Sequence, residues 1–215
     1  MEFPPLKAAT FVRRINRFVG EIFLEGRLVK ALIRNTGRLS ELLKPGNAVF
    51  VREKKGGKYG YEILLARAQK SLVCIESHYA NALFEEYLIK QGIKGFRKEY
   101  NFKGMRFDFL IGNTLVEVKS VNLVKNGIAM FPDAPTKRGA KHIRILTSLP
   151  KDLKPLLVFV CQREDCKAFR PNCEMDEEFC EAFYEYVSKG YTVKAFRCKV
   201  SLKEIYIAEE LDVWR

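Results

Sequence analysis

Two acidic and two basic residues stand among apolar ones in the stretch MRFDFLIGNTLVEVKS, residues 105–120. Gly112-Asn113 between two apolar runs predicts a β-hairpin with a two-residue loop. Such a loop pairs residues whose numbers sum to 225, so that Asp108 faces Glu117 and Arg106 faces Lys119. The charges are then expected on one side of the ribbon. The other side carries apolar residues: Phe107, Phe109, Val116 and Val118.

The preceding connection extends this pattern to a third strand. If Lys103-Gly104 forms its loop, opposite residues have numbers that sum to 207, and Glu99 faces Asp108. Three carboxylates would stand in a row, although like charges placed directly opposite are destabilising. A hard divalent cation, Mg²⁺ or Mn²⁺, held by Asp108 and Glu117 resolves the repulsion, with Glu99 assisting. Lys119 would act on water or on the charge of a phosphate.

These residue types at this spacing therefore predict metal-assisted phosphodiester hydrolysis, with Asp108, Glu117, Lys119 and Glu99 as catalytic residues. The alternative is a ladder of cross-strand salt bridges on a solvated sheet face. The acid-to-acid pairing disfavours that alternative, and so do the helices predicted on both sides of this sheet.

A helix predicted near residues 133–149 adds two candidate residues. On a helical wheel, Arg138 and His142 fall on the apolar stripe, where they would reach a substrate phosphate above the carboxylates. A histidine hydrogen-bonded in the core beside an arginine with a buried stem is the alternative. Lys137, Lys141 and Arg144 point outward as a solvated face.

Composition favours a polyanionic partner. The chain has 215 residues, with 38 Lys and Arg against 26 Asp and Glu, a net charge of +12 and a pI near 9.4. Nucleic acid is the first candidate, DNA before RNA. The start of the chain has no signal-peptide core, and no apolar run is long enough to span a bilayer. A cytoplasmic protein without a membrane partner is expected.

Residues 1–76 are predicted to form a small closed barrel of five or six short strands, of the oligonucleotide/oligosaccharide-binding (OB) type. This segment has 15 Lys and Arg against 7 Glu, so it carries eight of the twelve excess charges. Basic residues lie here among Phe11, Phe18 and Phe23, a mixture suited to phosphate contacts and base stacking. The alternative is a phenylalanine core with a solvated basic face. The arginines concerned are Arg13, Arg14, Arg17, Arg34 and Arg38.

Residues 77–215 are predicted to fold as an αβββαβ unit followed by αββ, an α+β or α/β domain. Ser77 caps the first helix, Asp133 or Thr136 the second and Asp176 the third. The cysteines form no CxxC pair, which makes zinc a weak hypothesis. Buried free thiols are expected, with one disulfide in a hyperthermophile.

Asp on the second strand and Glu-x-Lys on the third resemble the PD-(D/E)xK nuclease superfamily, matched here by Asp108 and Glu117-Val118-Lys119. The motifs FVRRINRFVGEI, NTGRL, EVKSVNLV and FPDAPTKRGAKH resemble the sugar fermentation stimulation protein A family over essentially the whole chain. Met105 and Leu32-Ile33-Arg34 depart from the pattern expected of that family. The resemblance implies an OB-like barrel joined to a nuclease-like domain, DNA binding and regulation of sugar use. It also implies site positions: Glu99, Asp108, Glu117, Lys119, Asp133, Arg138 and His142.

Three functions remain to be compared. The leading hypothesis is a Mg²⁺-dependent nuclease in which the basic barrel holds the nucleic acid. The second is a non-catalytic DNA-binding regulator on a nuclease scaffold, since fold does not fix function. A carbohydrate-binding protein, the third, leaves the net charge of +12 unexplained.

Overall fold

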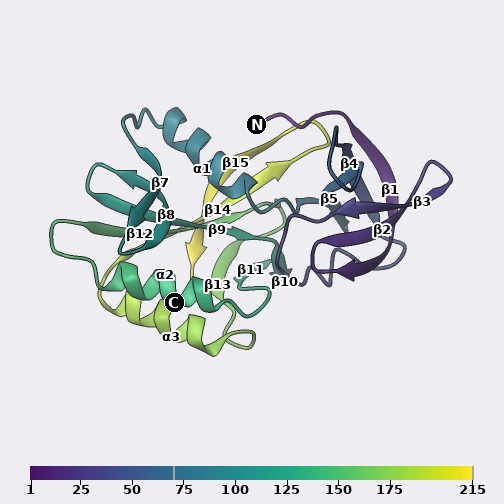
Figure 1. Ribbon diagram of the computed structural model, residues 1–215. Helices are drawn as coiled ribbons and strands as arrows, with labels where there is room; N and C mark the ends of the chain where they lie inside the picture. The colour runs from purple at the N-terminus through teal and green to yellow at the C-terminus, as the bar shows by residue number, and fades with distance from the viewer. Residues whose placement is uncertain (70, 215) are drawn as a thin grey trace.

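The computed structural model describes residues 1–69 and 71–214 and contains two β-sheets, which Figure 1 shows side by side. The first sheet has the strand order β3-β2-β1-β4-β5-β6, and a parallel pairing of β3 with β5 closes five of its strands into a barrel. This confirms the predicted OB-type barrel. Its strands are β1 (Leu6–Asn16), β2 (Val19–Leu24), β3 (Arg27–Leu32), β4 (Ala48–Glu53), β5 (Tyr61–Ala68) and β6 (Ser71–Cys74).

The second sheet is mixed and has the order β10-β11-β13-β15-β14-β12-β9-β8-β7. Its strands follow the predicted order, with β10, β11 and β13 as short additions. The strands are β7 (Arg97–Phe102), β8 (Met105–Ile111), β9 (Thr114–Val121), β10 (Leu123–Lys125), β11 (Ile128–Phe131), β12 (Lys154–Cys161), β13 (Ala168–Pro171), β14 (Thr192–Val200) and β15 (Ile205–Val213).

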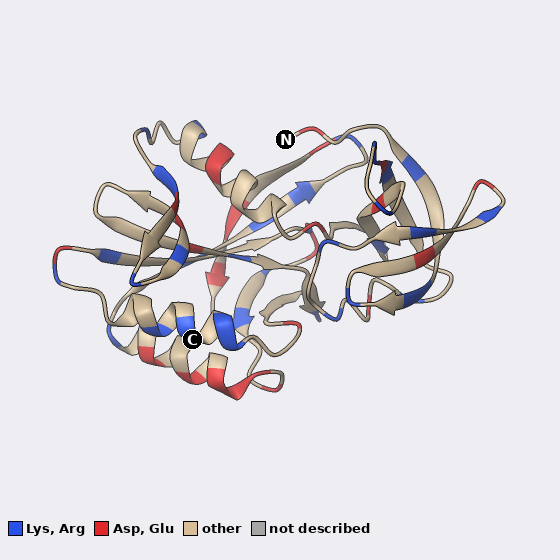
Figure 2. Cartoon of the chain, in the orientation of Figure 1, with Lys and Arg blue, Asp and Glu red and all other residues tan. Residues whose placement is uncertain are grey.

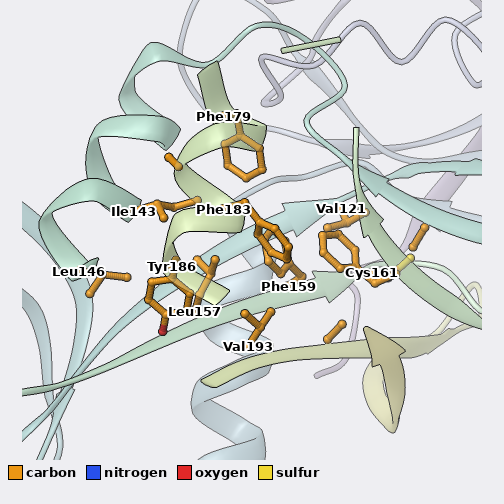
Figure 3. Packing of buried hydrophobic residues seen from close by; sticks show 14 of the residues in the cluster. Val121, Ile143, Leu146, Leu157, Phe159, Cys161, Phe179, Phe183, Tyr186 and Val193 are labelled. Atoms are coloured by element: carbon orange, nitrogen blue, oxygen red, sulfur yellow. The ribbon is translucent and has the colours of Figure 1, made fainter. Parts of the chain in front are cut away.

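Helices cover both faces of this second sheet. α1 (Tyr79–Lys90) lies on one face, and α2 (Lys137–Thr147) and α3 (Glu177–Ser188) lie on the other (Figure 1). Figure 3 shows Ile143 of α2 and Phe183 of α3 packed over Phe159 of the central strand β12. The continuous apolar run of β12 was predicted from the sequence, because a strand covered on both faces needs no polar alternation.

The helix ends match two of the three predicted caps. Thr136 caps α2 by accepting from Gly139 N at 3.1 Å, and Asp176 caps α3 by accepting from Phe179 N at 2.9 Å. The prediction for α1 is wrong, because His78 occupies the N-cap position and the Ser77 hydroxyl donates to the Arg34 carbonyl instead.

The barrel and the second unit are joined by a shared apolar cluster and by several hydrogen bonds. Phe50, Leu64 and Leu65 of the barrel are buried in one cluster with residues of α1, β9 and β14. Asn35 of the barrel donates from Nδ2 to Asn122 Oδ1 at 2.9 Å. Residues Met1–Phe3 hydrogen-bond to residues 203–205 of the second unit. The barrel is therefore anchored to the second unit by apolar packing and by hydrogen bonds.

Two further features concern the whole described chain. Cys173 and Cys180 form a disulfide, and Cys74, Cys161, Cys166 and Cys198 are buried free thiols. None of the helices in residues 1–69 and 71–214 has the length and apolar character needed to cross a bilayer.

Candidate functional site

The hairpin between β8 and β9 has the predicted register up to a defined point. Ile111 pairs with Thr114, and the regular pairing continues to Phe109 with Val116. Beyond that point the side chain of Asp108 takes the place of a main-chain acceptor, because its Oδ2 accepts from Val118 N of β9 at 2.7 Å. Its Oδ1 accepts from the Nδ2 of Asn81 in α1 at 2.5 Å. Both carboxylate oxygens of Asp108 therefore help to position it.

The predicted row of three carboxylates is not formed. The pairing of β7 with β8 follows the predicted sum of 207 on both sides of Glu99 and Asp108 but skips these two residues. Glu99 has a φ of 53°, its side chain is 70% exposed, and its carboxylate lies 3.6 Å from Arg106. A left-handed residue interrupts the strand, so Glu99 turns out to the rim of the site. The predicted pairings of Asp108 with Glu117 and of Arg106 with Lys119 are not observed either, because the regular pairing of β8 with β9 ends at Phe109 and Val116.

The same interruption changes the faces of β8. Phe107 packs in the cluster beneath α2 and α3, whereas Phe109 packs in the cluster beneath α1. The prediction that both rings share one face is therefore wrong. The irregular backbone at Asp108 reverses the alternation and lets its carboxylate reach β9 and α1 together.

Glu117 lies at the centre of the site and is buried. Its Oε1 accepts from Lys119 Nζ at 2.5 Å and from His142 Nδ1 of α2. Its Oε2 is buried without a hydrogen-bond partner among the residues that the structure describes, and the same holds for His142 Nε2. Glu117 thus presents one oxygen that residues 1–69 and 71–214 leave free for another ligand.

The two acids have shifted pKa values in opposite directions. Burial, followed by the charge of Glu117, raises the pKa of Asp108 to about 6. Burial also acts to raise the pKa of Glu117, but the Lys119 ammonium and His142 outweigh it and hold that pKa below its usual value. A charged Glu117 beside a readily protonated Asp108 is a pair whose second negative charge needs a cation.

A cavity of about 260 Å³, here called the acid cavity, contains these groups. The residues lining it include Asp108, Glu117, Lys119 and His142, with Glu99, Arg106 and Arg138. Arg138 is exposed, as are the outward residues Lys137, Lys141 and Arg144. The structure therefore brings together the central residues predicted from the sequence, with Glu99 and Arg106 at the rim.

The barrel arginines have separate surroundings. Arg14 donates to the carbonyl oxygens of Arg17, Asn35, Gly37 and Arg38, so it organises the loops around it. Arg13 pairs with Glu21 at 2.5 Å, and Arg34 lies 3.6 Å from Glu76. Arg17 and Arg38 are exposed at the edge of the barrel that faces the second unit.

The phenylalanines of the barrel also divide. Phe11 is buried in the barrel core, whereas Phe18 and Phe23 are 49% and 51% exposed. Figure 2 shows Lys and Arg on several barrel strands and on α2, while acidic residues gather along α3. Basic residues therefore occur on both units, and Arg138 of α2 is among those that line the acid cavity.

The structure adds site residues that the sequence did not indicate. Asn81 and His78 line the acid cavity from the start of α1. Nothing in the spacing of α1 distinguishes Asn81 from the other polar residues of that helix. Asp133, which the family resemblance placed at the site, lies outside the acid cavity and accepts from Leu39 N of the barrel at 2.7 Å.

The donor set suits a divalent cation bound partly by substrate. Asp108 and Glu117 supply carboxylates, and Glu117 Oε2 is buried and free of protein partners in the described chain. Residues 1–69 and 71–214 hold no group of three or more His, Cys, Asp or Glu arranged to hold a metal ion. Mg²⁺ is often held by one or two carboxylates together with water and substrate phosphate, so two acids are sufficient for it.

Comparison with known proteins gives consistent matches over the whole chain. The model of the SfsA N-terminal OB domain matches residues 12–75, and the model of the sugar fermentation stimulation protein RE domain matches residues 78–204. A sugar fermentation stimulation protein homolog of Aquifex aeolicus is 66% identical, covering 97% of this chain and 98% of its own. A homolog from Carboxydothermus hydrogenoformans is 39% identical, covering 98% and 97%.

A solved structure is similar as well. The SfsA protein of Pyrococcus furiosus, determined in complex with Ca²⁺, is 31% identical and has a TM-score of 0.89, covering 100% of this chain and 98% of its own. Fold, sequence and both domain matches agree, and the chain belongs to the sugar fermentation stimulation protein A family.

Proposed function

We propose that this protein is a divalent-metal-dependent nuclease that hydrolyses phosphodiester bonds in nucleic acid, with DNA as the preferred substrate over RNA. The observation that carries the proposal is the arrangement around Glu117. One of its oxygens is buried and has no hydrogen-bond partner in the part of the chain that the structure describes, while the other is held by Lys119 at 2.5 Å and by His142. Asp108 stands beside it with a pKa raised by burial and by the Glu117 charge.

Two further facts support the use of a divalent cation. Mg²⁺ and Ca²⁺ both take oxygen ligands, and the similar Pyrococcus furiosus protein was determined in complex with Ca²⁺. When bound, Mg²⁺ or Mn²⁺ would supply positive charge that polarises a phosphoryl oxygen and makes water more acidic. Asp108 and Glu117 are the residues that would hold it.

The remaining residues of the acid cavity have distinct roles. Lys119 is oriented by Glu117, so its ammonium is placed to offset the negative charge that builds on the phosphate. His142 fixes the Glu117 carboxylate from the α2 side. In the reaction a water oxygen bonds to phosphorus while that water gives up a proton to the solvent. The bridging P–O bond breaks, and the leaving alcohol oxygen takes up a proton.

Binding of the polyanion draws on exposed arginines of both units. Arg138 lines the acid cavity, and Arg17 and Arg38 lie at the barrel edge nearby. Arg13, Arg34 and Arg106 already have acidic neighbours, so their contribution is expected to be smaller. With a net charge of +12, nucleic-acid binding should weaken steeply as salt is added.

A cleavage panel tests the function. Supercoiled duplex, linear duplex, single-stranded DNA and RNA are each incubated with the protein and Mg²⁺, Mn²⁺ or EDTA. We expect cutting with a metal and none in EDTA. Asp108→Asn and Lys119→Met should each lower the rate by about 100-fold or more, because the first removes a metal-binding carboxylate and the second removes a positive charge beside the reacting phosphate.

Lys141→Met is the matched control, since Lys141 is on the same helix as His142 but exposed on its outer side. It should cut like the unaltered protein. Failure to cut any form with either metal would overturn the proposal. Tight, sequence-selective and metal-independent DNA binding without cutting would instead support a regulator.

A further inference from the structure

A second cavity, here called the junction cavity, lies between the barrel and the second unit. It has a volume of about 270 Å³. Asn35, Thr36 and Gly37 line it from the barrel, and the segment 130–136 lines it from the second unit. Val118, Lys119 and Thr136 line both this cavity and the acid cavity, so the two spaces adjoin. A group held in the junction cavity would therefore lie next to the candidate catalytic lysine.

The polar lining of the junction cavity offers hydrogen-bond donors and acceptors. Asn122, Ser77 and Ser120 line it with polar side chains. Asn35 also lines it, and its carboxamide is held in place by hydrogen bonds to Ile75, Gly37 and Asn122. Asn122 Nδ2 donates to the Cys74 carbonyl at 2.7 Å, a bond that uses one of its two amide hydrogens. Carboxamides and hydroxyls are the groups that pair with the edges of unstacked bases.

The charges are separated in a way that favours a base inside and phosphates outside. Asp133 lines the junction cavity and is half-buried, which disfavours a phosphate and suits the amino groups of a base. Arg17 is exposed at the barrel side, and Lys119 lies at the boundary with the acid cavity. Phe131 and Pro132 supply apolar wall against which a flat ring can pack.

The walls are held in place by contacts across the units. Asp133 Oδ2 accepts from Leu39 N at 2.7 Å, and Asn35 Oδ1 accepts from Gly37 N at 2.8 Å. A Cβ at Gly37 would lie 2.9 Å from Asp133 Oδ2, so the barrel loop approaches as closely as glycine allows. A preorganised cavity loses little entropy when it is filled.

From these observations we infer that the junction cavity takes one unstacked base of a nucleic-acid strand whose backbone passes the acid cavity. This rests on the proposed nuclease function and specifies its substrate as a strand that can present an unpaired nucleotide. Enzymes that need such access act on single strands or draw a nucleotide out of a duplex.

Binding measurements test the inference without any cutting. The probe is a fluorescein-labelled single strand of twelve deoxynucleotides, compared with a strand of equal length built from abasic units. Both are titrated in EDTA and followed by fluorescence anisotropy. We expect the strand with bases to bind about tenfold more tightly, in line with the gain from packing a base on a protein surface.

Two variants fill the junction cavity from opposite walls, Thr36→Trp from the barrel and Ala134→Trp from the second unit. Either should reduce the preference for bases to less than about twofold while leaving the affinity for the abasic strand unchanged. Ala208→Trp is the control, because Ala208 lines a separate cavity beside Arg197 and Glu164. It should keep the full preference. Circular dichroism and thermal melting establish that each variant is folded.

Equal affinity for the two strands in the unaltered protein would overturn the inference, and so would a full preference retained in both filled variants. Displacement of the strand by inorganic phosphate as readily as by deoxyadenosine would also overturn it, because the cavity would then bind anions. Failure of the nuclease proposal is separately visible. Cutting would be absent with every metal while the preference for bases and its loss in the filled variants persisted.

Discussion

The carboxylate of Asp108 acts both as a main-chain partner and as an acid of the candidate site. It accepts from Val118 N and from Asn81 Nδ2, and burial together with the Glu117 charge raises its pKa to about 6. A protonated Asp108 is therefore favoured by folding in the absence of a cation. The stability that this adds is fully present below pH 4 and is lost as the pH rises through about 6.

This gives a prediction for Asp108→Asn, which removes the titration and keeps a similar shape. In EDTA the variant and the unaltered protein should have similar free energies of unfolding at pH 4. At pH 7.5 the variant should be more stable by up to about 3 kcal/mol, from a shift of about two pH units. Urea unfolding at both pH values measures the difference.

Asp152→Asn is the control for this prediction, since Asp152 is exposed and the hydrogen bond that it accepts from Asn113 Nδ2 is made by its backbone carbonyl oxygen, not by its side chain. It should show no such divergence with pH. The prediction is contradicted if Asp108→Asn is no more stable than the unaltered protein at pH 7.5. Ionisation of Asp108 would then cost the folded state no free energy.

At the scale of elements, Asp176 joins two helix starts. Its Oδ1 accepts from Phe179 N at the start of α3, and its Oδ2 accepts from Thr136 N, the cap residue of α2. α2 carries His142 and, in its first turn, Arg138, so this single acid connects the position of the site to α3. Both hydrogen bonds involve an ionised acceptor, the stronger kind.

Asp176→Ala should therefore lower the free energy of unfolding by about 2 kcal/mol, more than the loss of one ordinary N-cap. Urea unfolding at pH 7 gives this value directly. Asp152→Ala serves as the comparison and should change the free energy of unfolding by less than about 0.5 kcal/mol. If Asp176→Ala lowered the free energy of unfolding no more than Asp152→Ala does, neither hydrogen bond of Asp176 would contribute to stability.

The strand registers and the second and third helix caps could be predicted from the sequence, because short loops and local hydrogen bonds fix them. Gly112-Asn113 and Lys103-Gly104 give the registers observed in the paired segments. The left-handed backbone at Glu99 could not be predicted in the same way, because nothing about a glutamate at this position indicates a φ of 53°. The contact of Asn81 with Asp108 joins α1 to β8 and depends on tertiary packing alone.

At the scale of the whole molecule, the barrel loop at Gly37 lies close against Asp133 of the second unit. A Cβ there would lie 2.9 Å from Asp133 Oδ2 and 3.0 Å from Asn35 Oδ1. The side chains of Asp133 and Asn35 both hold the barrel loop through hydrogen bonds. A methyl group at this position must therefore displace atoms that connect the barrel to the second unit.

Gly37→Ala should lower the free energy of unfolding by about 1–3 kcal/mol, the usual range for overpacking. Gly60→Ala is a close control, since Gly60 lies in open space and its added methyl group meets no atom within 4 Å. Thermal melting of the two variants side by side measures the contrast. Equal melting temperatures would show that the loop can shift freely.

The shared apolar cluster has a consequence for any attempt to divide the chain. Phe50, Leu64 and Leu65 are lost with the barrel if residues 77–215 are produced alone, yet they belong to the same buried cluster as Phe84 of α1. The truncated second unit would expose a large apolar patch to water and would self-associate. The full chain is accordingly the smallest piece suited to calorimetry, where it should melt as a single peak.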